Sequence, residues 1–324
     1  MNDVVVVGEA LVDIVQRLDG SVDAHPGGSP ANVALGLARL GRDVGLLTKI
    51  GDDEQGLMVR AHLLSSGLRL LPGSVNGQPT STATAHLDPS GAASYDFDLD
   101  WSLPAELDLP AHRALHTGSI ATFLPPGGDA VLALVEQQAG RTTISYDPNA
   151  RPALMGAADA ARERVQRFVA SADLVKVSDE DLTWLAPGTD PLDVVDDWLA
   201  CGPSLVVLTR GGEGAVALCR AGRVTIPAPR ITVVDTVGAG DSFMSGLLDR
   251  LLDADLLGAD RAGALRAIDT DTVEAVLRHA IRIAAITCTR AGADPPTRAE
   301  LEKGLQAELR PELPAELPTE LPTE

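Results

Sequence analysis

The stretch that decides the fold reads Asp235-Thr236-Val237-Gly238-Ala239-Gly240-Asp241. A β-branched run, residues 231–234, precedes it, and apolar residues at helical spacing follow it from Phe243 onward. We therefore predict a strand that enters a tight turn, which opens directly onto a helix N-terminus. Small residues leave the backbone N–H groups of such a turn uncovered, and the helix dipole adds partial positive charge. The turn is therefore suited to bind an anion such as phosphate.

Asp241 places a carboxylate beside this predicted anion site. A negative group next to a phosphate is costly, and the task that suits it is to take a proton from an attacking hydroxyl. The alternative is an ordinary glycine-rich turn in which Asp241 only interacts with the helix dipole. The pattern favours phosphoryl transfer, with Asp241 as the base and the amides of Gly238, Ala239 and Gly240 around the phosphoryl group.

Short β-branched runs alternate with helical patterns along the chain. These runs cover residues 4–7, 44–48, 115–120, 143–146, 174–177 and 205–209. The alternation predicts parallel βαβ units, hence an α/β fold with a sheet covered by helices on both faces. Motif residues follow the predicted strands at Gly8, Gly51, Gly118, Asp147, Ser178, Gly211 and Asp235. Because ligands bind along the carboxyl edge of such sheets, we expect these positions to converge on one site.

Further motifs accompany the heptad in a fixed order. They are Gly27-Gly28-Ser29-Pro30-Ala31-Asn32, Gly51-Asp52-Asp53, Asp147-Pro148-Asn149 with Arg151, Thr209 with Gly211 and Gly214, and Gly292-Ala293-Asp294. Together they resemble the signatures of the ribokinase-like carbohydrate kinases of the phosphofructokinase-B type, in the form that fructokinases carry. The resemblance covers roughly residues 3–303. It implies a three-layer α/β/α domain with a mostly parallel central sheet and a small β-sheet lid.

Two extended segments interrupt the alternation. Residues 80–87 and 94–99 flank Asp88-Pro89-Ser90-Gly91, whose residue types suit a type I turn, so that a hairpin is predicted. The family resemblance makes this hairpin part of the lid, from about residues 11–26 and 79–101; a decorative surface hairpin is the alternative. In the helix after Gly28, Ser29 suits the N-cap and Gly41 the C-cap. We expect the kinase domain to cover residues 1–307.

The end of the chain, residues 308–324, repeats Glu-Leu-Pro units about every four residues. Recurrent proline prevents a continuous helix, and the segment has too little apolar surface for a core of its own. We predict a mobile or polyproline-like tail without a catalytic role.

For the sugar, the resemblance points to Asp13, Gly27, Gly28 and Asn32. An aspartate and an asparagine can together accept from and donate to adjacent hydroxyls, which suits a polyol. The alternatives are a solvated loop acid for Asp13 and a helix cap for Asn32. Arg151 could meet a phosphate or a substrate carboxylate, or form an ion pair with Asp147 or another acid.

For the nucleotide, the resemblance points to Ser178, Thr209, Gly211, Gly214, Ile281 and Ala285. The last two also fit an apolar core stripe at helical spacing. Where the family has Asn-x-x-Glu near Mg²⁺, this chain has Ser178-Asp179-Glu180-Asp181, so Asp181 would reach the ion through a water, or Glu180 would take part. The family also implies a monovalent-cation site, such as one for K⁺, at carbonyls near Asp235, Val237 and residues 289–292.

Composition limits the partners of the chain. Its 324 residues carry a formal net charge of −20 at pH 7, which argues against nucleic acid and anionic membranes. Its cysteines, Cys201, Cys219 and Cys288, are odd in number and widely spaced, which favours a reducing cytoplasm over a disulfide framework or a zinc site. Because a strand is predicted at once, from Val4, we expect no leader, and no apolar run has the length of a membrane span. The family implies a homodimer through the lid.

The function expected from these features is an ATP-dependent hexose kinase that converts fructose to fructose 6-phosphate. A 2-keto-3-deoxygluconate kinase is the alternative within the class, because Arg151 could bind a sugar carboxylate. The lid segment 95–99 lacks the arginine that many fructokinases carry, which weakens the assignment of fructose as the substrate. A sugar-binding regulator without activity is the alternative outside the class. A nicotinamide-dependent oxidoreductase is disfavoured because no Gly-x-Gly-x-x-Gly follows the first strand.

Overall fold

The computed structural model of the chain describes residues 2–87, 93–104 and 107–308. The predicted hairpin turn at residues 88–91 and almost all of the predicted tail, residues 309–324, lie outside the described residues. No helix within the described ranges is long and apolar enough to cross a membrane.

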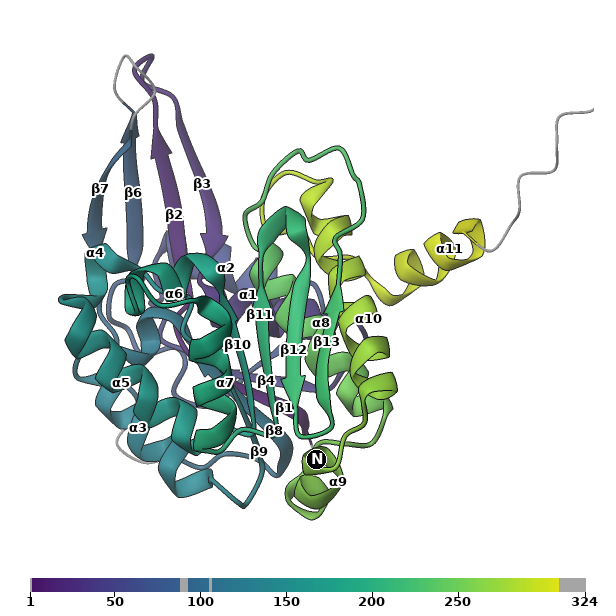
Figure 1. Ribbon diagram of the computed structural model, residues 1–324. Helices are drawn as coiled ribbons and strands as arrows, with labels where there is room; N and C mark the ends of the chain where they lie inside the picture. Colours follow the sequence, from purple (N-terminus) through teal and green to yellow (C-terminus); the bar gives the residue numbers. More distant parts are fainter. Residues whose placement is uncertain (1, 88–92, 105–106, 309–324) are drawn as a thin grey trace, which may run out of the picture.

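A nine-stranded sheet forms the centre of the molecule (Figure 1). In spatial order it consists of β13 (Gly222–Ile226), β12 (Ala215–Cys219), β11 (Leu205–Thr209), β10 (Leu174–Ser178), β9 (Thr143–Asp147), β8 (His112–Gly118), β1 (Asn2–Val7), β4 (Val44–Leu47) and β5 (Arg69–Leu70). Neighbours from β11 to β5 pair in parallel, whereas β12 and β13 pair antiparallel. The predicted α/β class with a mostly parallel sheet is confirmed.

Helices cover both faces of this sheet. They are α1 (Ser29–Arg39), α2 (Glu54–Leu64), α3 (Gly127–Gln138), α4 (Pro152–Met155), α5 (Ala158–Ser171), α6 (Asp179–Leu185), α7 (Pro191–Cys201), α8 (Ala239–Asp253), α9 (Ala262–Arg266), α10 (Thr270–Cys288) and α11 (Arg298–Glu308), with short 3₁₀ turns η1 (Ser119–Thr122), η2 (Gly211–Glu213) and η3 (Ala259–Arg261). Helices α1, α8 and α10 share one apolar core, and α3, α5, α6 and α7 share the other. Strand β1 joins them, because Val4 and Val6 face the first core while Val5 and Val7 face the second.

A second, four-stranded sheet forms the lid, which stands out from the body of the molecule in Figure 1. Its order is β3 (Val22–Gly27), β2 (Leu11–Gln16), β6 (Thr82–Leu87) and β7 (Ala93–Asp98). Strand β2 pairs antiparallel with β3 and parallel with β6, and β6 forms an antiparallel hairpin with β7. Both segments that we assigned to the lid therefore belong to one sheet, as expected.

Three local predictions were wrong. Residues 231–234 form no strand; they are exposed, and the chain there is held by N–H groups of Val234 and Asp235 that donate to the Cys288 carbonyl oxygen at the end of α10. The predicted strand 115–120 ends at Gly118 and continues into η1. The N-cap of α1 is Gly28 rather than Ser29, because Gly28 adopts a φ of 104° and turns the chain one residue earlier.

Candidate active site

The glycine turn forms the N-terminus of α8, as the heptad predicts, although no strand precedes it. Gly238 is the N-cap in a left-handed conformation with φ 73°, and a Cβ there would lie 2.5 Å from the Cβ of Ala293. The N–H of Ala239 donates to the Thr236 carbonyl oxygen at 3.2 Å and so is partly used within the turn. The first N–H groups of a helix have no partner inside it, and those of Gly240 and Asp241 stand in this position. Because residues 238–240 are only partly buried, the turn is accessible to a ligand.

Asp241 connects this turn to the motif at the other end of the chain. Its side chain accepts a hydrogen bond from the Ser29 hydroxyl at 2.6 Å (Oγ to Oδ1) and one from the Asn32 amide at 2.9 Å (Nδ2 to Oδ2). The residue is 7% exposed. Two signatures more than 200 positions apart are thus brought into direct contact. Ser29 was assigned to the N-cap, yet its hydroxyl orients the predicted base.

The residues predicted for the sugar lie where the lid meets α1. Asp13 in β2 lies so close to Gly27 in β3 that a Cβ on Gly27 would be 2.1 Å from Asp13 Oδ2. A Cβ on Gly28 would lie 2.5 Å from the Glu9 carbonyl oxygen, and φ at Gly28 is 104°, so both features require glycine. Asp13 retains exposed surface, but its surroundings desolvate the carboxylate and raise its pKa, against the opposing charges of Arg151 and His25.

Arg151 follows β9 and interacts through its charge with Asp13 of the lid and with Glu9. Its guanidinium donates to Asn149 Oδ1 at 2.8 Å and to the Ala150 carbonyl oxygen at 2.9 Å. Burial raises the pKa of both Asp13 and Glu9, and the positive charge of Arg151 opposes this rise, so Arg151 lies near both acids on the side predicted for the sugar. The alternative ion pair between Arg151 and Asp147 is not formed, because Asp147 pairs with a different cation.

That cation is Lys176, which the sequence analysis did not single out. Its Nζ lies 2.7 Å from Asp147 Oδ2, and both side chains are almost fully buried. Burial raises the pKa of Asp147 to about 6, although Lys176 opposes the shift. A charged residue in the apolar run of residues 174–177 is the signal that could have identified it. Glu9 was missed in the same way; burial raises its pKa to about 7, and its Oε2 accepts the Ala121 N–H at 3.0 Å.

The acidic stretch after β10 begins α6. Ser178 and Asp181 form a capping box, in which Ser178 Oγ accepts the Asp181 N–H at 3.0 Å and Asp181 Oδ2 accepts the Ser178 N–H at 3.2 Å. Asp181 Oδ1 also accepts the Ala150 N–H at 2.8 Å, whereas Glu180 is exposed. Both Asp181 oxygens are therefore engaged, which fits an outer contact to Mg²⁺ through water better than direct binding.

No group of three metal-ligating side chains within the described ranges could hold a metal by itself. Mg²⁺ commonly takes one or two carboxylates and completes its ligands with waters and substrate phosphates. The donor set near Asp181 is compatible with that mode.

Four of the six residues predicted for the nucleotide lie at the end of β10 or between the end of β11 and the start of β12. Ser178 and Thr209 are register partners at the ends of β10 and β11. Gly211 has φ 47° and Gly214 φ 99°, and they form the turn into β12, where a Cβ on Gly214 would lie 2.1 Å from the Ile226 carbonyl oxygen. On α10, Ile281 is 8% exposed and packs in the core, as the alternative of an apolar core stripe predicts. Ala285 is only half-buried.

The segments predicted for a monovalent cation are joined by Asp235. Its Oδ2 accepts the Gly292 N–H at 2.8 Å, and its Oδ1 accepts the Val237 N–H at 3.0 Å. These backbone hydrogen bonds lower the pKa of Asp235. The turn and the loop after α10 are therefore held together, with Val237 itself exposed.

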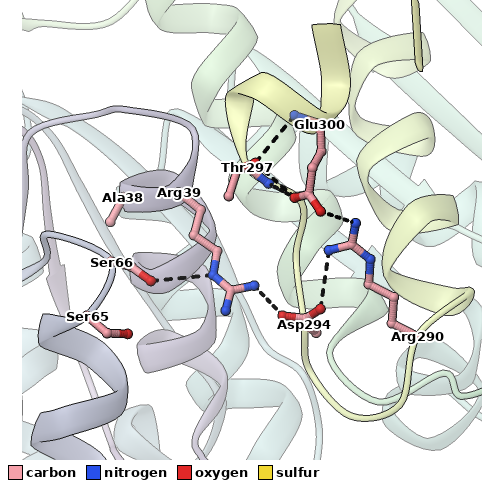
Figure 2. Close-up of a pocket in the computed structure, with 8 residues that line it drawn as sticks. All are labelled: Ala38, Arg39, Ser65, Ser66, Arg290, Asp294, Thr297 and Glu300. Atoms are coloured by element: carbon pink, nitrogen blue, oxygen red, sulfur yellow. Dashed lines mark hydrogen bonds and ion pairs between the residues drawn. The ribbon is translucent and has the colours of Figure 1, made fainter. Parts of the chain in front are cut away.

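A cavity of about 690 Å³ lies behind this loop, between the ends of α1 and α2 and the start of α11 (Figure 2). Asp294 there pairs with both Arg39 and Arg290, and Arg290 also pairs with Glu300 at 2.7 Å. Since each of these charged groups already has a partner of opposite charge, the cavity offers no obvious binding group. Its network braces the Gly292 loop against α1.

Comparisons with known proteins agree with this geometry. The model of the family described as pfkB family carbohydrate kinase matches residues 1–300. A fructokinase of Rhizobium leguminosarum bv. trifolii is 35% identical over 268 residues, which cover 80% of this chain and 82% of that protein.

Two solved structures are similar over nearly the whole chain. The fructokinase of Xylella fastidiosa with bound ATP superposes with a TM-score of 0.80 at 24% identity, covering 95% of this chain and 99% of that one. An engineered double mutant of the fructokinase of Vibrio cholerae O395, with fructose, ADP and potassium ion bound, gives a TM-score of 0.75 at 26% identity, covering 94% of this chain and 98% of that one.

Proposed function

The chain belongs to the pfkB family of carbohydrate kinases, and from this premise we propose that it transfers the γ-phosphoryl group of ATP to fructose, giving fructose 6-phosphate. The observation that carries the proposal is the contact of Asp241 with Ser29 and Asn32. It places a carboxylate between a helix N-terminus suited to phosphate and a motif suited to a polyol. The fructokinase of Vibrio cholerae, which binds fructose, ADP and potassium ion, supports the choice of ligands.

In this proposal Asp241 is the base that removes the proton of the attacking hydroxyl. Each carboxylate oxygen has two acceptor sites, and one on each is used by Ser29 or Asn32. The remaining sites can accept the sugar hydroxyl, while the two fixed hydrogen bonds hold the carboxylate in one orientation. A carboxylate is a weak base, but the hydroxyl becomes acidic as its bond to phosphorus forms.

The phosphoryl group would lie at the free amides of Gly240 and Asp241, where the helix dipole stabilises negative charge. Asp181 would hold Mg²⁺ through a water, and the ion would supply positive charge that neutralises the phosphates. Thr209, Gly211 and Gly214 would border the nucleotide, and Asp13, Asn32 and Arg151 the sugar. A K⁺ ion near Asp235 and the Val237 carbonyl would add positive charge beside the turn.

A substrate panel tests the proposal. Release of ADP is measured with fructose, ribose, 2-keto-3-deoxygluconate and adenosine, and the phosphorylated product is identified. We expect fructose to give the highest kcat/KM. Preference for 2-keto-3-deoxygluconate would make Arg151 a carboxylate ligand and reject fructose, and Arg151→Met should then abolish that preference. Sugar binding without turnover of any compound would favour a regulator and reject the kinase.

We further propose that two copies of the chain pair through their lids. On the edge strand β7, Tyr95 and Phe97 stack with ring centroids 5.9 Å apart, and they are 58% and 41% exposed. Apolar side chains grouped on an exposed sheet edge are typical of an interface. Light scattering on the full chain should give the mass of a dimer, and Phe97→Ser should lower it toward that of one chain. A monomer at all concentrations would contradict this proposal.

A further inference from the structure

A buried lysine lies directly beneath the glycine turn. The chain has only three lysines, Lys49, Lys176 and Lys303, although Lys and Arg together number 26. The Lys176 side chain is 4% exposed. A Cβ built on Gly240 would lie 3.1 Å from Lys176 Nζ and 3.9 Å from its Cε. The ammonium therefore lies on the side of the turn toward which a Gly240 side chain would point.

Three carboxylates surround this ammonium. Asp147 contacts it at 2.7 Å, and Asp181 and Asp241 act on it through their charges. Although burial opposes its charged form, these acids raise the pKa of Lys176, so it stays protonated at neutral pH. The cluster contains the predicted base, the residue predicted near Mg²⁺, and the aspartate of the Asp-Pro-Asn motif. The charge of Lys176 thus interacts with all three carboxylates.

We propose that Lys176 is a positioning residue of the phosphoryl-transfer site: its ammonium, anchored on Asp147, supports Gly240 from below and fixes the turn and Asp241 relative to each other. The proposal rests on the proposed function. It assigns Lys176 more than the neutralisation of Asp147, because the ammonium also lies 3.1 Å from the Cβ position of Gly240, within the turn at which the phosphoryl group is expected to lie. The ammonium also offsets the negative charge of three carboxylates close to a site that must accept a polyphosphate.

The expected effect follows from this geometry. Lys176 touches neither ligand, so its loss should change KM less than kcat. A displacement of about 1 Å of a reacting group can cost about 10²-fold in rate. Lys176→Met, which keeps the length of the side chain without its charge, should therefore lower kcat about 10- to 100-fold. KM for fructose should stay within about threefold, because Asp13 and Asn32 are untouched.

The substitution must be made in two backgrounds, because Lys176→Met alone leaves Asp147 buried and unpaired. Such a charge can destabilise the fold by itself. Asp147→Asn removes the charge of the partner while keeping its shape, and the double variant removes both charges. The double variant should therefore regain most of the melting temperature that Lys176→Met loses. Comparing the kcat of the double variant with that of Asp147→Asn then measures the effect of Lys176 in the absence of its partner's charge.

We expect the double variant to have a kcat about 10- to 100-fold below that of Asp147→Asn, with KM for fructose unchanged. Equal kcat values for these two variants would overturn the proposal, since Lys176 would then only neutralise Asp147. A loss expressed in KM alone would overturn it as well. Wild-type protein without turnover of any sugar would reject the proposed function itself, whereas active wild type with an equally active Lys176→Met variant would reject only the role of Lys176.

Discussion

At the scale of single residues, the site depends on a one-residue displacement at the start of α1. Gly28 takes the cap position with φ 104°, a conformation that favours glycine. Ser29 is thereby released from capping, and its hydroxyl donates to Asp241. Serine and glycine are both common at helix N-caps, so sequence rules could not decide between them. The tertiary contact with a residue 212 positions away decides the outcome.

Gly240 tests the phosphate turn. Its Cβ position lies 3.1 Å from Lys176 Nζ, within the turn proposed to bind the phosphoryl group. Gly240→Val should lower kcat by about 10²-fold or more, because the branched side chain would displace either Lys176 or the turn and so shift the amides expected to bind the phosphoryl group. Gly263→Val is the matched control, since Gly263 lies in a helix with no atom within 4 Å of its Cβ position. Steady-state kinetics should show a loss in the first variant only, and equal activities would contradict the turn as the phosphate site.

Glu9 predicts a pH-dependent stability. Burial raises its pKa from 4.5 to about 7, so the folded state binds a proton more tightly than the unfolded chain. Its contribution is therefore fully favourable below about pH 4.5 and is lost as the pH rises to about 7. Glu9→Gln removes this loss and should be more stable than wild type by about 2–3 kcal/mol at pH 8, with little difference near pH 4.5. Urea unfolding of both proteins at pH 4.5 and pH 8 measures the difference in their free energies of unfolding. A difference that does not change with pH would contradict a raised pKa for Glu9.

At the scale of elements, a buried carboxylate fastens the helices behind the site. Asp249 in α8 is fully buried and accepts from Arg42 Nε at 2.6 Å, His279 Nε2 at 2.7 Å and Arg298 Nη2 at 2.5 Å. These partners come from the loop after α1, from α10 and from α11. Burial works against the charge, but His279 and the two arginines hold the pKa of Asp249 below its usual range. The orientation of α8, and hence of the turn at its start, depends on this group.

Asp249→Asn should lower the free energy of unfolding by about 2–3 kcal/mol. Removing one partner of a buried pair costs about 3–5 kcal/mol, and the partly exposed cations here reduce that value. Asp253→Asn is the control, because Asp253 binds the same Arg42 at the surface, where such pairs contribute about 1 kcal/mol or less. Urea unfolding of both variants makes the comparison. Equal losses would show that Asp249 does not fasten these helices.

The elements also show where prediction from sequence ends. The parallel strands were predictable, since runs such as Val4–Val7 must be buried on both faces. Residues 231–234 have the same β-branched composition but lie exposed beyond the edge strand β13. Composition alone does not reveal that a sheet is already complete. Lys176 was hidden for a related reason, because its partner Asp147 lies on a neighbouring strand, and pairing between strands is set by topology.

At the scale of the whole molecule, the order of the strands brings the two ends of the sequence together. Strand β1 lies inside the sheet, so α1 after it packs against α8, and the motifs at Asn32 and Asp241 meet. The convergence of motif residues at the strand ends could be predicted, because parallel strands share one carboxyl edge. The hydrogen bonds among them could not, because they depend on side-chain placement between helices.

The most direct test of the account is the turnover of Asp241→Asn with ATP and fructose, measured beside its affinity for ATP. A general base contributes about 10²- to 10⁴-fold to a rate. We predict a loss of kcat in this range with nearly unchanged ATP binding, and wild-type kinetics for Asp253→Asn, an aspartate at the far end of the same helix. Turnover of Asp241→Asn at the wild-type rate would contradict the role of Asp241 and, with it, the mechanism proposed for this chain.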